Sequence, residues 1–119
     1  MVDVDALGQH AADYGFAYLI TITPHSRVHT SVVHPSVGDG AVTVPISDRV
    51  RRNVGENAEV SLVWPPADAT GYSLIADGTG VDRDGVLTIA PTRAILHRPA
   101  TEPSAPGAAD GCVQDCVEL

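Results

Sequence analysis

The residues of this chain best suited to bind a ligand are Ser47, Arg49 and Arg52, which follow an apolar strand pattern over residues 41–46. Ser47 and Asp48 both favour the start of a helix, and the short helix that follows carries three of the seven basic residues. A helix start offers free N–H groups and a positive dipole end, and arginine adds paired donors that suit phosphate. The segment therefore predicts an anion site. The alternative is a solvated helix whose arginines offset an acidic protein.

Composition narrows the kind of anion. The chain has 119 residues, which indicates one domain, and its formal net charge is −8. That charge argues against a nucleic-acid partner, which would need a broad basic face. All seven basic residues are arginine and none is lysine. An arginine cluster in an acidic protein indicates a local task, such as holding one small anionic ligand, although biased codon usage would also give arginine without lysine.

The chain shows no membrane or metal pattern. Hydrophobic residues make up 44% of the sequence, but no run approaches the ~20 apolar residues of a membrane helix. The first ten residues lack the basic region and apolar core of a signal peptide, so we expect a cytoplasmic protein. Cys112 and Cys116 do not have the usual zinc spacing, and two thiolates do not fill a tetrahedral site. We therefore expect reduced thiols and no metal.

Apolar periodicity and turn residues divide the chain into short elements. The predicted helices cover residues 4–14, capped by Asp3 or Asp5 and ended by Gly15, and residues 49–57. The predicted strands cover residues 16–23, 27–34, 41–46, 58–64, 72–81 and 86–98.

Turn chemistry joins these strands into hairpins. Asp39-Gly40 and residues 82–85 are hairpin turns, and Gly78 and Gly80 are expected to bend the fifth strand. This pattern predicts a mainly β fold, a six-stranded antiparallel split β-barrel with two short helices. The proline-rich residues 99–119 are expected to form an extended tail after a domain of residues 1–98.

The order of elements resembles the flavin-binding split β-barrel proteins of the pyridoxamine 5′-phosphate oxidase-like group, over roughly residues 16–98. In that family the third strand leads into a Ser-Arg-Lys-x-Arg-Asn-Leu segment, and residues 48–54 here, Asp-Arg-Val-Arg-Arg-Asn-Val, are similar. Residues 60–63, Val-Ser-Leu-Val, match the next family strand, and residues 78–80, Gly-Thr-Gly, resemble its bend.

The resemblance implies a homodimer with flavin mononucleotide (FMN) at its interface. It implies a phosphate near the start of the arginine helix and an isoalloxazine ring against the second and third strands. The implied cofactor-binding residues are Thr30, Ser31, Val32, Val33, Val44, Pro45, Ile46, Ser47, Arg49 and Arg52. The implied function is hydride or electron transfer to a small substrate, with the ring supplying the chemistry. No residue stands out as a proton donor, so no catalytic residue is assigned.

Two positions depart from the family pattern: Asp48 replaces serine and Val50 replaces lysine. A carboxylate about 6 Å from a phosphate costs about 2–3 kcal/mol at an effective dielectric constant near 20. Loss of one charged hydrogen bond costs roughly 1.5–3 kcal/mol more. These departures favour an alternative, a cofactor-free split-barrel protein with a binding or structural role. A deazaflavin-dependent reductase is a further alternative. If a histidine touches the ring, His29 or His34 is the better candidate by position, although the two face opposite sides of one strand.

Overall fold

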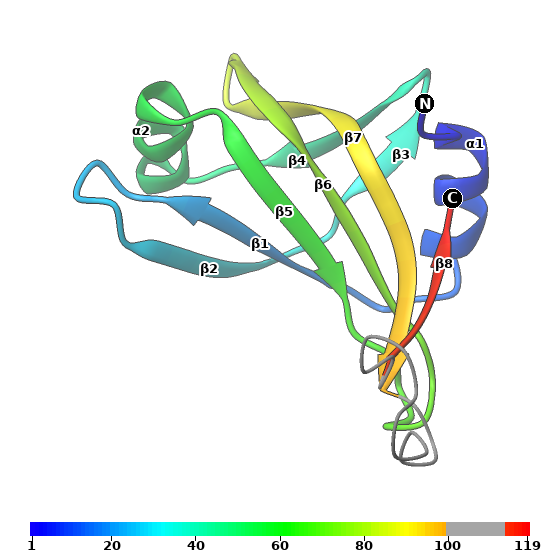
Figure 1. The fold of residues 1–119 in the computed structure, drawn as a ribbon. Coiled ribbons are helices and arrows are strands. Elements are labelled where there is room, and N and C mark those ends of the chain that lie inside the picture. Colours follow the sequence, from blue (N-terminus) through cyan, green and yellow to red (C-terminus); the bar gives the residue numbers. More distant parts are fainter. Residues whose placement is uncertain (100–113) are drawn as a thin grey trace.

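The computed structural model describes residues 1–99 and 114–119, and Figure 1 shows them as a curled sheet flanked by two short helices. In chain order the elements are α1 (Val4–Ala11), β1 (Ala17–Ile22), β2 (Val28–Val33), β3 (Ser36–Gly38), β4 (Ala41–Pro45), α2 (Asp48–Glu56), β5 (Glu59–Trp64), β6 (Ser73–Arg83), β7 (Val86–Pro99) and β8 (Gln114–Glu118). The predicted helices and the six predicted strands all occur, with ends shifted by a few residues.

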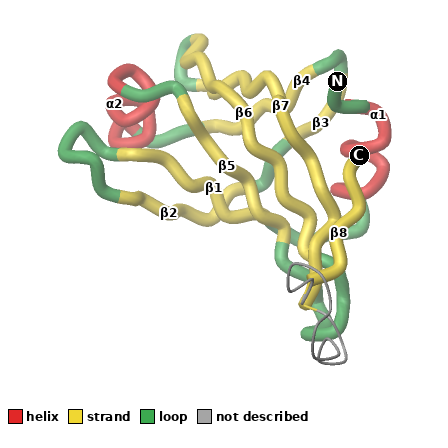
Figure 2. Tube along the Cα trace, viewed as in Figure 1, coloured by secondary structure: helices red, strands yellow, loops and turns green. Residues whose placement is uncertain are grey.

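All strand pairs in this sheet are antiparallel. Seven strands follow the order β2-β1-β5-β6-β7-β4-β3, and β8 pairs with β7 off this path. The long strand β7 has 14 residues, so its first part pairs with β4 and its last part with β8. Figure 2 shows the sheet curling so that α2 lies near the β1–β2 hairpin and α1 lies on the opposite side.

The prediction of six strands is wrong, because the described residues form seven strands in sequence along the sheet and an eighth beside β7. The first strand missed is β3, three residues long within a segment expected to be only a turn. The Asp39-Gly40 turn beside it is confirmed, with φ values of 52° and 78°. The second is β8, in the segment expected to be a tail, of which residues 100–113 lie outside the described part.

The sheet of the described residues also has two edges. Its strand order begins at β2 and ends at β3, so it forms a curled half-barrel. His34 and Pro35 connect these two strands. Proline has no N–H to donate and restricts the residue before it, so the chain leaves the ladder at this point and passes from one edge to the other.

The concave side of the sheet holds the core. Alternate residues of each strand point to one face, and the inward positions of β1, β5 and β6 are almost fully buried. The core side chains include Ala17, Leu19, Val42, Val44, Val60, Leu62, Trp64, Leu74, Ala76, Leu87 and Ile89. Leu7 of α1 and Val50 of α2 join this cluster from the two sides.

Local chemistry explains where the helices begin. Asp3 caps α1, and its carboxylate accepts a hydrogen bond of 3.1 Å from the Ala6 N–H. The helix ends at Ala11 with Ala12 as its C-cap, earlier than the expected stop at Gly15. Neither helix in the described part of the chain has the length and apolar character needed to span a bilayer.

Candidate functional site

The start of α2 is built by Ser47. Its hydroxyl oxygen accepts a hydrogen bond of 3.3 Å from the Val50 N–H, so Ser47 is the N-cap and Asp48 is the first helical residue. The Asp48 side chain is 94% exposed and lies 3.7 Å from a guanidinium nitrogen of Arg51. Asp48 therefore does not cap the helix, and both solvent and Arg51 screen its charge.

Arg51 has a structural role that the sequence did not indicate. Its Nε lies 3.0 Å from Oδ2 of Asp82, on the β6–β7 hairpin. Half of its side chain is shielded from solvent, with 49% exposed. Arg51 thus ties α2 to that hairpin and faces away from the other two arginines of the helix.

The buried face of α2 fixes how the helix sits on the sheet. Val50, Asn53 and Val54 are buried, and Val50 is only 2% exposed. The Asn53 side-chain amide donates a hydrogen bond of 3.0 Å to the hydroxyl of Thr21 on β1, and both side chains are buried. The position where the family has lysine is therefore a core position here, and Asn53 orients the helix.

A hollow of about 570 Å³ lies between α2 and the β1–β2 turn. Arg49 and Arg52 line it from α2, and Arg27 lines it from the turn. His25 and His29 also contribute, and its described lining contains no carboxylate. The ion pairs among the described residues use Arg51 and Arg93, and none involves these three arginines. We call this cavity the arginine hollow.

The β1–β2 turn holds Arg27 in place through its own hydrogen bonds. The hydroxyl oxygen of Thr23 accepts from the backbone N–H groups of His25 at 3.3 Å and Arg27 at 3.1 Å. The Thr23 N–H in turn donates to the Arg27 carbonyl at 2.7 Å. Ser26 has a φ of 61°, as a tight turn requires. Arg27 is thus carried on an ordered turn.

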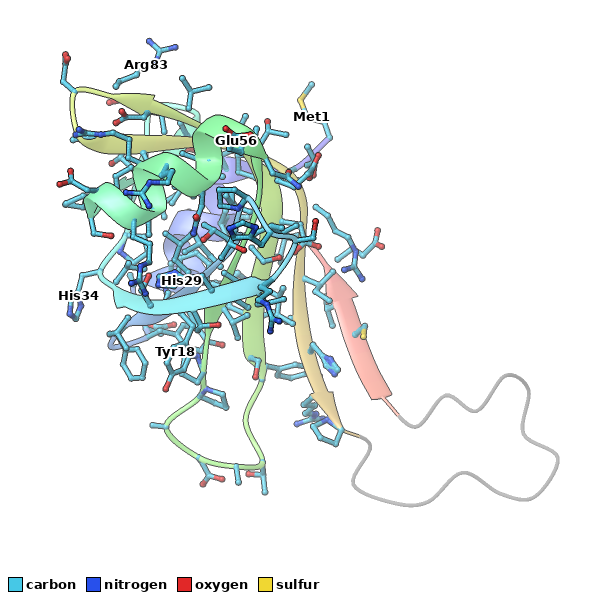
Figure 3. The ribbon with its side chains drawn as sticks, turned by 90° about the vertical axis from the view of Figure 1, so that its left-hand side faces the viewer. Met1, Tyr18, His29, His34, Glu56 and Arg83 are labelled. Atoms are coloured by element: carbon cyan, nitrogen blue, oxygen red, sulfur yellow. The ribbon has the colours of Figure 1, made fainter. Side chains whose placement is uncertain are left out.

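Two buried polar atoms of β2 lack a partner, and one of them belongs to His29, which lines the arginine hollow. His29 Nδ1 and Ser31 Oγ are buried and accept or donate no hydrogen bond within the described residues. His29 lies opposite Thr21 in the β1–β2 register, and Figure 3 shows it between β2 and α2. Unpartnered buried polar atoms are costly. Together with the three arginines, they fit an anionic ligand that carries hydrogen-bonding groups.

The predicted site residues fall into separate groups. Arg49 and Arg52 meet in the arginine hollow, and Ser47 begins the helix that carries them. Thr30 and Val32 are exposed on the convex face of β2, whereas Ser31 and Val33 face inward.

The third-strand positions are also divided. Val44 is fully buried in the core. Pro45 is exposed opposite Val86, and Ile46 is half-buried against the core. The assignment of all ten residues to one cofactor stays a prediction.

Sequence reasoning missed the contribution of the β1–β2 turn. Arg27 and His25 lie more than twenty residues from Arg49 in the chain, and only the packing of α2 brings them together. A basic residue beside a predicted tight turn was the available signal, but it did not say which element would pack there.

The cysteines and histidines form no metal site within the described residues, where no group of three or more potential ligands occurs. Cys116 is an exposed free thiol on β8, opposite His97 of β7. Cys112 lies outside the described residues. His34 is exposed at the end of β2, whereas His29 faces the arginine hollow.

Comparison with solved structures identifies the fold. A "Putative Pyridoxamine 5′-phosphate oxidase" from Listeria innocua has a TM-score of 0.66 at 11% identity, over 78% of this chain and 96% of that one. An F420 reductase has a TM-score of 0.58 at 12% identity, over 66% and 87%. A heme binding protein from Mycobacterium smegmatis has a TM-score of 0.62 at 16% identity, over 91% of this chain and 54% of that one.

The chain therefore has the split β-barrel fold of these proteins, as the sequence suggested. No protein-family model matches the chain. Two mycobacterial proteins, Uncharacterized protein Mb0449c of Mycobacterium bovis and Uncharacterized protein MT0457 of Mycobacterium tuberculosis, are each 43% identical to it over 133 aligned residues. These alignments cover 98% of this chain and 93% of each relative. The chain belongs to the family of these mycobacterial proteins.

Proposed function

We propose that this protein binds an anionic, flavin-type cofactor whose phosphate lies in the arginine hollow, and that it transfers hydride or electrons to a small substrate. The observation that carries the proposal is the meeting of Arg27, Arg49 and Arg52 in one cavity without a carboxylate, in a protein with a net charge of −8. All three side chains are exposed, and guanidinium groups that line one hollow would bind an anion through charge and paired hydrogen bonds. The expected cytoplasmic location is part of this proposal.

Asp48 and Val50 depart from the family pattern and were expected to weaken phosphate binding. The charges around them reduce that expected loss. Asp48 is exposed and paired with Arg51, so its repulsion of a phosphate is screened. Arg27 adds a positive charge from the turn, and it would compensate for the lysine that Val50 replaces. Each charged hydrogen bond to the phosphate contributes about 1.5–3 kcal/mol.

FMN is the first candidate, and a deazaflavin is the second, since similar folds include proteins named for pyridoxamine phosphate oxidation and for F420 reduction. A bound flavin supplies the hydride or electron chemistry. The residues of this chain would bind and orient it. Arg49 and Arg52 would hold the phosphate, and His29 and Ser31 would supply hydrogen bonds from the inner face of β2.

We also propose that the protein is a homodimer that associates through the convex face of β1 and β2. We define the outer face as the outward side chains of these strands, Tyr18, Ile20, Ile22, Val28, Thr30 and Val32. Val28 is 72% exposed and Val32 60% exposed, although both lie on an edge strand of the sheet. Exposed apolar side chains on an edge strand favour association. Two of the predicted ring contacts, Thr30 and Val32, belong to this face.

Ligand titration with a matched charge control tests the cofactor proposal. FMN, a deazaflavin and heme are each titrated into the protein and followed by fluorescence quenching or absorbance. We expect FMN or the deazaflavin to bind, and Arg49→Ala to weaken that binding roughly 10- to 150-fold, the equivalent of one charged hydrogen bond. Arg83→Ala removes the same charge at an exposed position outside the hollow, and it should change binding less than twofold.

Three results would count against the proposal. If no ligand binds, the cofactor-free alternative is favoured. If heme binds and neither flavin does, the cofactor is heme and the flavin proposal is wrong. If a flavin binds but Arg49→Ala and Arg83→Ala have equal affinities, the phosphate is held elsewhere.

A further inference from the structure

A second hollow, of about 740 Å³, collects most of the aromatic side chains of the protein. The chain has five aromatic residues, three tyrosines, one phenylalanine and one tryptophan. Tyr14, Phe16, Tyr18 and Tyr72 line this hollow, and the tryptophan is buried in the core. If the aromatic residues were scattered over the surface, four of the five would not be expected to line one cavity. We call this cavity the aromatic hollow.

The aromatic hollow lies away from the arginine hollow and shares no lining residue with it. It is formed by the end of α1, the start of β1 and the connection between β5 and β6. Figure 3 shows Tyr18 on the side of β2 opposite to His29. The two cavities thus occupy opposite ends of the β1–β2 hairpin.

Hydrogen bonds and ring contacts order the walls of the aromatic hollow. The Tyr14 hydroxyl donates a hydrogen bond of 2.8 Å to the Tyr72 carbonyl. Burial, and then the nearby Asp13 carboxylate, raise the pKa of Tyr14 above its usual value, which keeps this donor protonated. Phe16 and Tyr18 pack edge to face with ring centroids 5.3 Å apart. The Arg98 guanidinium lies 4.4 Å from the centre of the Tyr72 ring.

The lining of the aromatic hollow is acidic, unlike that of the arginine hollow. Asp13 and Asp68 line it together with His10, and the only arginine described beside it is Arg98, whose guanidinium lies over the Tyr72 ring in its wall. Asp68 is held by two hydrogen bonds of 2.8 Å, from the N–H and the hydroxyl of Thr70. These bonds lower the pKa of the Asp68 carboxyl, so it remains charged at neutral pH. An anionic ligand would be repelled from this cavity.

We propose that the aromatic hollow binds a small organic cation that contains a planar aromatic ring. The exposed parts of Phe16 and Tyr18 offer ring faces and edges for stacking, and the aromatic faces and the two carboxylates both attract positive charge. Pro65 and Pro66 add rigid apolar walls. A concave, mostly apolar cavity with a few charged groups suits a small molecule. The inference does not require a flavin in the arginine hollow.

The test uses proflavine, a planar aromatic cation, with fluorescein as an anionic counterpart of similar size. Fluorescence anisotropy is measured as the purified protein is added to each dye at low ionic strength. We expect saturable proflavine binding and at least tenfold weaker fluorescein binding. Binding of proflavine should weaken in high salt, because the carboxylates contribute through their charge.

Variants locate the binding site. Asp13→Asn should weaken proflavine binding several-fold, whereas Asp39→Asn removes the same charge from the exposed β3–β4 turn and should leave it unchanged. Phe16→Leu should weaken binding about two- to tenfold through loss of ring stacking, with the thermal midpoint measured to confirm folding. Equal affinities for the two dyes, or equal effects of Asp13→Asn and Asp39→Asn, would overturn the proposal.

Cross-titration separates this inference from the cofactor proposal. Arg49→Ala should not change proflavine binding, and Asp13→Asn should not change FMN binding. A protein that binds proflavine in this way but binds no flavin supports the aromatic hollow alone. If Arg49→Ala reduces proflavine binding as much as Asp13→Asn does, the dye is not bound in the aromatic hollow.

Discussion

The arginines of α2 are neighbours in the sequence, but they make different contacts because helix geometry places them on different faces. Arg49 and Arg52 are three positions apart and share a face of α2, and both line the arginine hollow. Arg51 lies between them and instead pairs with Asp82. Asn53 is four positions after Arg49, and it is anchored to Thr21 beneath the hollow. The orientation of the two arginines therefore depends on this buried hydrogen bond together with the packing of Val50 and Val54.

Replacing Asn53 tests that anchor. Asn53→Leu leaves the Thr21 hydroxyl without its donor and should lower the free energy of unfolding by about 1–3 kcal/mol. Thr21→Val should have a similar effect, since it leaves the Asn53 amide unpaired. Because the two side chains form one interaction, the double variant should lose less than the sum of the single variants, by roughly 1 kcal/mol. Urea unfolding measures all three, and strictly additive losses would mean that the bond contributes no stability.

Among the secondary-structure elements, β6 and β7 form a long hairpin that pairs with β5 on one side and with β4 and β8 on the other. A glycine allows this hairpin to bend. The pairing register of the two strands shifts between Asp77 and Gly78, which marks a β-bulge. A side chain at Gly78 would collide with the backbone carbonyl of Ala90. At the bend predicted for Gly78, the backbones of β6 and β7 therefore approach each other too closely for a side chain. Gly55, near the end of α2, has open space around it.

These two glycines should respond to alanine in opposite directions. Gly78→Ala forces a backbone shift at the bulge and should cost about 1–3 kcal/mol of stability, as overpacking does. Gly55→Ala meets nothing and lies in a helix, so it should add about 0.5–1 kcal/mol. Thermal unfolding of the two variants beside the parent protein measures both changes. A Gly78→Ala protein as stable as the parent would show that the hairpin relaxes without cost.

At the scale of the whole molecule, the two hollows and the outer face are arranged around one hairpin. The arginine hollow lies at the β1–β2 turn, and the aromatic hollow lies at the start of β1. The outer face extends between them along the convex side, and Tyr18 belongs to both the outer face and the aromatic hollow. A second copy bound to the outer face would therefore lie beside both cavities.

A charge on the outer face should prevent the proposed dimer. Val32→Glu places a carboxylate where the side chain is already 60% exposed, so the folded protomer should tolerate it. The dimer should then dissociate at micromolar concentration, because burying an unpaired charge in an interface is costly. Val117→Glu, at a 44% exposed position on β8, is the control and should leave the dimer intact. Sedimentation velocity distinguishes these results, and a parent protein that is monomeric throughout would contradict the proposal.

Features that depend on neighbouring residues could be predicted from the amino-acid sequence. Alternating β-branched residues specified β1, β2 and β4, and Asp39-Gly40 specified the turn between β3 and β4. Ser47 specified the start of α2, because a hydroxyl at that position satisfies a free N–H two or three residues later. The spacing of Arg49 and Arg52 likewise placed both on one helix face.

Which residues those elements bring together depends on how the elements pack in three dimensions. Arg27 joins Arg49 because Asn53 and Val50 pack α2 onto the sheet. The four aromatic residues meet because α1, β1 and the β5–β6 connection converge. The strand β8 was not expected because residues 99–119 were interpreted together as an extended tail. Its five residues form a strand by pairing with the end of β7. Periodicity reports which face of an element is buried, whereas a binding site depends on which elements that burial brings into contact.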